Sequence, residues 1–280
     1  MRSNVIVSIA KKEIMDNIRN KWIILVSVMF AVLTIVVSYF GSLQSKGWQD
    51  LGLTISGMAN LVTFLVPIIA LMLAYATIIG EIERGSMNSL LSLSINRYEI
   101  VIGKFLGLAG VLCFTIVVGF GTAGLLIAAN VPNVNYVDYG IFIGSTMLLG
   151  LVFLTIALCL STMFNKRSTA MGGAIFLWFL FNIILPIVFL GLLITSIDFN
   201  QVIEQQTLVV PEWYNVLNLL NPTSVYSSIL TSAIGPISSS TPADFSSPSW
   251  YSAEFLVGVL FAWVFVFFII GLWRFQRKDI

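Results

Sequence analysis

The side chains that most often perform catalysis are scarce in this sequence. The 280 residues include no histidine, so the commonest general base and the commonest metal ligand are both missing. A serine nucleophile therefore has no histidine to activate it. No GxxxxGK[ST] loop is present to hold the phosphates of ATP. These absences predict that the chain is not an enzyme and binds no metal or cofactor of its own.

The two cysteines, Cys113 and Cys159, are the remaining candidates for metal chemistry. Both fall in the inner half of an expected pair of antiparallel apolar helices, so their thiols could approach each other. Metal passage through a membrane requires a cluster of soft ligands, and two thiols alone do not make one. We favour the interpretation that they pack as two small apolar groups.

Charged side chains do gather around one glycine. Glu81, Glu83 and Arg84 stand directly before Gly85, which can act as a hinge. They are attached to an apolar run, so a movement at this point would reach that run. A solvated loop with helix-end charges and a lever driven by an ATP-powered partner both fit this pattern.

The residues after this glycine predict two helical segments. Ser86 can cap a short helix over Met87–Leu93. Asn96 followed by Glu99 has capping-box spacing, so a longer helix is expected to begin near Arg97. The short helix mixes polar and apolar residues, which suits docking on a partner protein better than lying in lipid.

The elements that position these residues are membrane helices. The chain is 58% hydrophobic and 10% charged, whereas soluble domains carry roughly 25% charged residues. A helix needs about 20 apolar residues to cross a bilayer. We therefore predict an all-α integral membrane protein with six transmembrane helices in a single domain, residues 1–280. The six runs, all free of acidic and basic residues, are Trp22–Phe40, Met58–Ile79, Phe105–Ala129, Ile141–Phe164, Ala170–Ile194 and Phe255–Trp273.

Basic residues predict the orientation of these helices. Thirteen of the 14 lysines and arginines would lie on one side of the membrane, and Lys46 alone on the other. Because basic loops stay in the cytoplasm, both termini are expected there, in the cell membrane. The first run starts at Trp22 and is too long for a cleaved signal peptide. The net charge of +1 provides no strong field for nucleic acid.

Residues 1–21 are expected to form an amphipathic helix in the inner membrane interface. An apolar stripe recurs at helical spacing, while charged residues occupy another face. The stripe consists of Val7, Ala10, Ile14 and Ile18, and the charged face of Lys12, Asp16 and Arg19.

The long connection between the fifth and sixth runs, residues 196–254, is expected to face outside. Pro211 can begin a short helix there. Asn221 and Pro222 can end that helix and cap a second one through Leu230. The aromatic residues assigned to the belt at the membrane interface are Trp213, Tyr214 and Tyr226.

The predicted membrane interior carries no ionisable residue. This argues against a channel or secondary transporter, because coupled transporters bind their ions through such residues. A kink at Pro186, with Asn182 hydrogen-bonding to a neighbouring helix, is the favoured interpretation of the one irregularity in the fifth run. Close helix packing is predicted where glycines recur four residues apart, at 103 and 107 and at 140 and 144.

The segment 80–104 resembles the coupling segment of type-2 ABC transporter permeases. That family has six crossings, an interfacial N-terminal helix and a cytoplasmic coupling helix between crossings two and three, with the pattern Glu-x-Glu-x-Gly-[Ser/Thr]. Its outer helices between crossings five and six are similar to the region around Asn221 and Pro222. The matching residues of the coupling segment are Glu81, Glu83, Gly85, Ser86, Arg97 and Lys104.

Three further segments narrow the resemblance to one branch of this family: Ala10–Leu33, Phe64–Glu81 and Gly103–Gly107. The resemblance implies a homodimer, two ATP-binding cassette subunits that hold ATP and magnesium, and room for an extracellular or periplasmic accessory protein. The substrate stays open between a copper species, a sulfur species, a lipid-like molecule and none. The direction of transport also stays open.

On this resemblance, the chain is the permease subunit that couples ATP hydrolysis in a partner to export or conformational signalling. The charged residues would orient a lever, the glycine would let it bend, and Met87 and Leu90 would fill a groove of the partner. A membrane mechanotransmitter or scaffold without a translocated substrate, and a channel or secondary transporter, are the alternatives. The residues assigned to the coupling contact are Glu81, Glu83, Arg84, Gly85, Ser86, Met87, Leu90 and Arg97.

Overall fold

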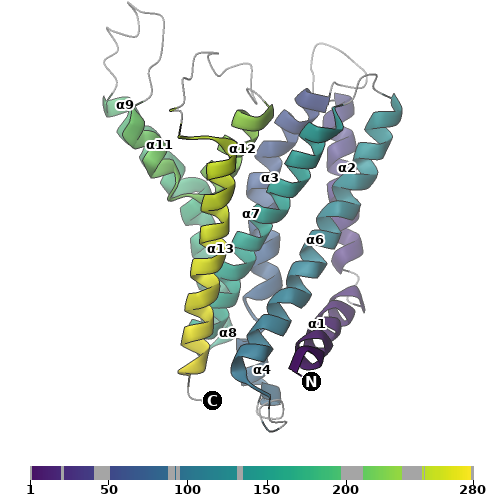
Figure 1. The fold of residues 1–280 in the computed structure, drawn as a ribbon, viewed down its shortest axis with the longest axis vertical. Helices are drawn as coiled ribbons and strands as arrows, with labels where there is room; N and C mark the ends of the chain where they lie inside the picture. Colours follow the sequence, from purple (N-terminus) through teal and green to yellow (C-terminus); the bar gives the residue numbers. More distant parts are fainter. Residues whose placement is uncertain are drawn as a thin grey trace, which may run out of the picture.

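The computed structural model describes residues 2–19, 22–40, 51–87, 92, 95–130, 135–196, 211–234, 248 and 250–278. Every regular element in these ranges is a helix, which confirms the all-α prediction (Figure 1). The helices are α1 (Arg2–Arg19), α2 (Trp22–Phe40), α3 (Leu51–Ala74), α4 (Ile79–Glu83), α6 (Arg97–Asn130), α7 (Tyr136–Met163), α8 (Arg167–Phe179), the π-helical η1 (Leu180–Ile184), α9 (Leu185–Ser196), α11 (Glu212–Asn218), α12 (Pro222–Ile234) and α13 (Ala253–Gln276).

Among the described residues, five helical segments are long and apolar enough to cross a membrane. They correspond to the second through sixth predicted runs. The first predicted run coincides with α2, whose described apolar part, Ile24–Tyr39, is shorter. The five segments are Thr54–Glu83, Arg97–Asn130, Tyr136–Met163, Arg167–Ser196 and Ala253–Gln276.

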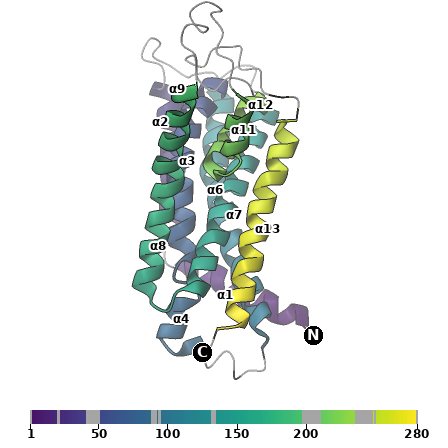
Figure 2. The ribbon, with the colours of Figure 1, turned by 90° about the vertical axis from the view of Figure 1, so that its left-hand side faces the viewer.

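Helix α7 forms the centre of the bundle, because it is apolar on every side. Leu149, Phe153 and Ala157 along it are fully buried. Helices α3, α6, α12 and α13 pack against it, and α2 packs on α6 (Figures 1 and 2). In the apolar stretch of α7, 72% is buried, against 17% in both the α8–α9 segment and α13. Those two segments therefore form the outer faces of the chain.

Helix α1 lies across the base of the bundle, at the end that holds both chain termini (Figures 1 and 2). It packs on α6 at two of the predicted close-packing glycines. An added Cβ on Gly103 would lie 2.8 Å from Ile9 Cβ, and one on Gly107 would lie 2.6 Å from Glu13 Cβ. Because no side chain fits at either position, the two helices approach each other closely.

The predicted apolar stripe of α1 is divided between two surroundings. Ala10 and Ile14 are partly buried, and Ile14 packs near Gly110 of α6. Val7 is 63% exposed. The side chain of Ile18 lies outside the described residues. The face that packs on α6 thus contains only part of the stripe.

The fifth predicted run is one helix interrupted by a π-bulge, formed by η1 between α8 and α9. In this bulge the N–H of Leu185 donates to the carbonyl five residues earlier. The next bond of this kind, to the carbonyl of Phe181, cannot form because Pro186 has no N–H. That carbonyl instead accepts hydrogen bonds from Asn221 Nδ2 at 2.8 Å and Thr223 Oγ1 at 3.2 Å. The start of the outer helix α12 is therefore tied to the bulge.

The predicted bond from Asn182 to a neighbouring helix is wrong. Its amide donates to the carbonyl of Trp178 in its own helix, at 3.1 Å. Asn221 makes the link between helices instead. It also caps α12 as expected, since its Oδ1 accepts from the N–H of Thr223 at 3.1 Å. Pro222 occupies the first helical position, where a missing N–H does no harm.

The aromatic residues predicted for the membrane belt differ in burial. Trp213 is 38% exposed and contacts Tyr214 edge to face. Tyr226, which was predicted to join this belt, is fully buried, and its hydroxyl lies 3.2 Å from Thr146 Oγ1 of α7. A hydroxyl partner in the core explains how the phenol is accommodated there. Pro211 precedes α11 as its cap and is not its first residue.

Candidate coupling site

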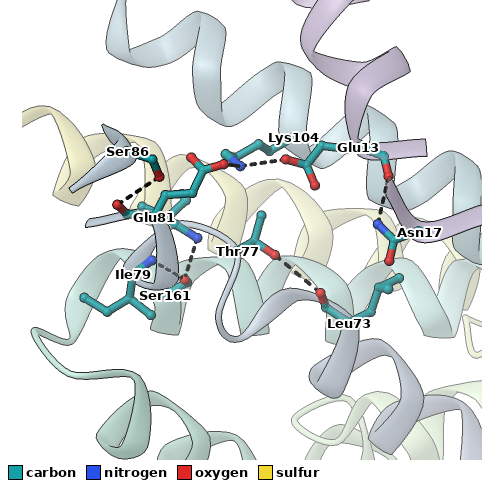
Figure 3. Close-up of polar contacts among 10 residues, drawn as sticks. Glu13, Asn17, Leu73, Thr77, Ile79, Glu81, Ser86, Lys104 and Ser161 are labelled. Atoms are coloured by element: carbon teal, nitrogen blue, oxygen red, sulfur yellow. Dashed lines mark hydrogen bonds and ion pairs between the residues drawn. The ribbon is translucent and has the colours of Figure 1, made fainter. Parts of the chain in front are cut away.

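The coupling segment begins where α3 ends and the chain turns into α4. The first N–H groups of a helix have no partner within it. Those of Ile78 and Ile79 both donate to Ser161 Oγ of α7, each at 3.0 Å (Figure 3). Ser161 thus fixes the direction in which α4 leaves α3. This role could not be predicted from the sequence, because a lone serine in an apolar run usually bonds to its own helix.

Lys104 of α6 joins three helices through a buried ion-pair network. Its Nζ lies 2.6 Å from Glu13 Oε1 of α1 and 2.8 Å from Glu81 Oε1 of α4 (Figure 3). Only 2% of the Lys104 side chain is exposed. A buried charge is costly unless it is paired, so the two carboxylates are what allow this lysine to be buried.

The burial of Lys104 was not predicted from the sequence. Lys104 was counted among the basic residues of the cytoplasmic side, and Glu13 was not among the predicted site residues. Within the network two carboxylates, one from α1 and one from α4, face one ammonium group. Glu81 reaches it through one oxygen, and its Oε2 is buried with no hydrogen-bond partner among the described residues.

Gly85 lies in a turn after α4, at the position of the predicted hinge. Its φ of +74° lies in the left-handed region, which costs other residues about 1–2 kcal/mol. The hydroxyl of Ser86 turns back and donates to the carbonyl of Glu81 at 3.3 Å. Glu83, Arg84, Gly85 and Ser86 are all exposed, so they form one continuous surface at the tip of the segment.

The structure describes only the first part of the predicted coupling helix. Ser86 and Met87 are helical. Residues 88–91, which include Leu90, and residues 93 and 94 lie outside the described residues. Met87 is fully buried in the chain itself, in a cluster with Ile78, Val101 and Phe275. This placement differs from the predicted role of filling a partner's groove. It makes Met87 an anchor that holds the hinge against α6 and α13.

Glu83 connects the segment to the start of α8. Its Oε1 accepts from the N–H of Arg167 at 2.7 Å. The residue that precedes α8, Lys166, makes no side-chain cap, so Glu83 supplies both a cap and a negative charge at the positive end of this helix. The guanidinium of Arg167 lies 5.7 Å from the ring centroid of Tyr75 and close to its hydroxyl. The end of α4 and the start of α8 thus meet at Glu83.

Arg97 connects the far end of the segment to α13. Its Nη1 donates to the carbonyls of Phe275 and Gln276, at 3.2 Å each, and to that of Lys278. Nearby, Lys278 Nζ donates to the carbonyls of Thr162 and Phe164 at the end of α7. Cations are favourable at helix C-termini.

Burial has an electrostatic cost for this last cation. Desolvation, with repulsion from Arg274 as the smaller cause, lowers the pKa of Lys278 below its ordinary value. Lys278 thus donates its hydrogen bonds to the last carbonyls of α7 despite this cost. Helix α6 begins at Arg97 as expected, and Glu99 accepts from the N–H of Asn96 at 2.9 Å in the predicted capping box.

The coupling segment contacts most helices of the bundle. The segment 78–97, which contains the exposed tip 83–86, is connected to α7 through Ser161, to α6 and α1 through the Glu81–Lys104–Glu13 network, to α8 through Glu83 and to α13 through Arg97. Within the described ranges, no three acidic, cysteine or histidine side chains come together as a metal ion would require. A displacement of the tip would therefore reach most of the bundle through a small number of polar contacts.

Comparison with known proteins identifies the family of the chain. Residues 7–280 match the family described as ABC-2 family transporter protein. The chain belongs to this family of membrane permeases, as the resemblance of its coupling segment indicated. Membership implies an ATP-binding cassette protein as partner in general.

Two relatives share almost the full length of the chain. One is the "Probable ABC transporter permease protein NosY" of Pseudomonas aeruginosa, 34% identical over 282 residues, with 99% of each chain covered. The other carries the same description, comes from Stutzerimonas stutzeri, and is 37% identical over 289 residues, with 98% of this chain and 99% of the relative covered. The chain is thus a NosY-like permease of the ABC-2 type.

Proposed function

We propose that the chain couples ATP hydrolysis in a separate nucleotide-binding subunit to export or conformational signalling across the cell membrane. The observation that carries this proposal is the buried network of Lys104, Glu13 and Glu81 directly behind the exposed tip 83–86. A solvated loop would not require a lysine that is 2% exposed. A lever does require such a fixed connection, because force applied at the tip must reach the membrane helices.

The assembly follows from the family and from the charge distribution. We propose six crossings, with α2 as the first, and both termini in the cytoplasm. Two copies of the chain would bind two ATP-binding cassette subunits, which hold the ATP and magnesium. The α11–α12 region would face an extracellular or periplasmic accessory protein.

The pathway between the two copies would be lined by α2, α3 and the α8–α9 segment. An apolar hollow of about 340 Å³ supports this assignment, because it lies between α3 and α8. Its walls include Ile68 and Tyr75 on one side and Met171 and Trp178 on the other. In this structure Trp178 Nε1 donates to the carbonyl of Phe64 at 3.0 Å, which holds the two helices together across the hollow.

Two substitutions test the lever. In the complex with its ATPase subunit, Glu83→Ala removes the contact with α8, and Gly85→Pro cannot adopt the φ of +74° that the hinge requires. We expect both variants to bind the ATPase subunit while ATP hydrolysis no longer drives function, with the larger loss for Gly85→Pro. Lys11→Ala, at an exposed site on α1, is the matched control. Unchanged coupled activity in both variants would rule out the lever.

A mechanotransmitter without a translocated substrate is the second candidate. The hydrogen bond from Trp178 Nε1 to the carbonyl of Phe64 favours it, because this bond holds α3 and α8 together. Solvent labelling of single cysteines along α3 in the ATP-bound complex separates the two functions. Labelling along the whole helix indicates a pathway, and labelling only at its ends indicates a closed transmitter. Ion flux from the chain reconstituted alone would support a channel instead.

A further inference from the structure

A groove of about 1060 Å³ opens in the half of the bundle away from the coupling site. Its walls come from α6, α7, α12 and α13, and they include Leu148, Leu151 and Phe261. None of these side chains takes part in the coupling site or in the hollow between α3 and α8. The groove therefore has no role in the proposed lever.

The groove exists because α6 and α13 meet near the coupling site and diverge beyond it (Figure 1). Phe105 and Phe268 join them there, with ring centroids 4.9 Å apart. Gly271 lets α13 lie directly on α7, since an added Cβ would stand 3.3 Å from Cys159 Cα. Phe261 precedes Phe268 by seven residues of α13, which is roughly 10 Å at 1.5 Å per residue. From that level outward, the space between α6 and α13 is open.

The length of the groove matches one leaflet of a bilayer. Along α7 its lining extends from Leu151 to Ile141, which is about 15 Å of helix. This is half of a hydrocarbon layer of about 30 Å. At the outer end, Trp250 and Phe255 contact each other edge to face and are both partly exposed. Aromatic residues of this kind mark the level of the lipid headgroups.

The outer end of the groove is polar and negatively charged. Ser232, Ser252 and Glu254 contribute to its lining there. Glu254 is exposed, and it is the one charged residue among the described residues of the lining. None of the described residues that line the groove is basic, and a carboxylate in such surroundings attracts an ammonium group and repels a headgroup that carries only negative charge.

We propose that this groove binds an acyl chain of a phospholipid whose headgroup carries an ammonium group, with Glu254 facing that ammonium. The apolar walls provide the contact for the chain, and the carboxylate selects the headgroup. The site belongs to a single copy of the protein and requires neither ATP nor a partner. Its test is therefore independent of the coupling function.

Native mass spectrometry of the purified full chain tests the proposal. The chain is exposed to equal amounts of phosphatidylethanolamine and phosphatidylglycerol with the same acyl chains. We expect about two- to fivefold more phosphatidylethanolamine to be retained, the ratio that one solvent-exposed ion pair provides. Glu254→Gln is expected to retain both lipids equally. Equal retention by the unmodified chain would overturn the proposal.

A groove-filling variant locates the bound lipid. An added Cβ on Gly144, which lines the groove, meets no atom within 4 Å, so Gly144→Leu fills the space without disturbing the core. We expect it to lose the retained lipid. Gly258→Leu is the matched control, because that glycine also has open space around it but lies outside the lining. Unchanged lipid retention in Gly144→Leu would overturn the proposal. Loss of dimers in this variant, with the lipid still retained, would overturn it too.

Discussion

The positions of α1 and α4 both depend on Lys104, whose ammonium group pairs with one carboxylate from each helix. Lys104→Met removes the charge and leaves Glu13 and Glu81 facing each other at a buried site. Breaking a buried pair from one side costs about 3–5 kcal/mol, because the remaining charges stay uncompensated. We therefore expect a large drop in the thermal stability of the purified chain, measured by unfolding in detergent.

One control for this prediction lies outside the network and the other lies within it. Lys11→Met removes an exposed charge from α1 and is expected to change stability by less than about 0.5 kcal/mol. Glu13→Gln keeps the pair between Lys104 and Glu81 and is expected to fall between the two. If Lys104→Met unfolds at the temperature of Lys11→Met, the network contributes nothing to stability.

Two asparagines allow a matched test of the link between the π-bulge and the outer helices. Asn221→Ala removes a hydrogen bond to Phe181 and the cap of α12. A buried hydrogen bond and a helix cap together contribute about 2–3 kcal/mol. Asn182→Ala removes only a bond within its own helix and is expected to cost less than about 1 kcal/mol. Equal losses in thermal unfolding would contradict the assigned link.

The sequence predicted the residues with local roles and missed those with distant partners. Gly85, the capping box at Asn96 and the cap at Asn221 depend on neighbours within three residues, so their types and spacing sufficed. Ser161 and Glu13 depend on which helices pack together. No single sequence carries that information in its spacing, because their partners are 82 and 91 positions away. The burial of Lys104 was missed for the same reason.

At the scale of elements, hydrophobic length predicted the helices, but not which face of each is covered. The predicted runs fall in helices because roughly 20 apolar residues have few other stable conformations in lipid. The stripe on α1 illustrates the limit. Its Val7 is exposed, while the close contact is made through Gly103 and Gly107 of α6. The small residues of α6 determine this packing, and a hydrophobic stripe on α1 gives no information about them.

The docking of α1 on α6 can be tested at Gly107. An added Cβ there would lie 2.8 Å from the carbonyl oxygen of Ala10, a backbone atom that cannot move aside alone. Gly107→Leu is therefore expected to push α1 away, at a cost of about 1–3 kcal/mol. A cysteine at Ile9 should then react faster with a water-soluble thiol reagent. Gly140→Leu, where the added side chain meets open space, is expected to leave the reaction rate unchanged.

The whole molecule presents two weakly buried outer faces that have different surroundings. The α8–α9 segment and α13 are equally unburied, so exposure alone does not distinguish a subunit interface from a lipid contact. Their neighbours do distinguish them. Helix α13 borders the groove of lipid length, whereas α8 borders the hollow beside α3 and receives the Glu83 contact from the coupling tip. We therefore expect a second copy to pack on the α8–α9 face.

Two phenylalanines of similar exposure test this assignment. Phe176 of α8 is 58% exposed and Phe265 of α13 is 60% exposed. Each is replaced by cysteine in a chain whose Cys113 and Cys159 are alanine, and membranes are treated with a short bifunctional thiol reagent. In a two-fold dimer, residues near the axis meet their own copies, so Phe176→Cys is expected to give cross-linked dimers and Phe265→Cys only monomers. The reverse result would place the second copy on the groove face. In that case protein would cover the groove, so the groove would not bind the lipid. Helices α3 and α8 would then not line the pathway between the copies.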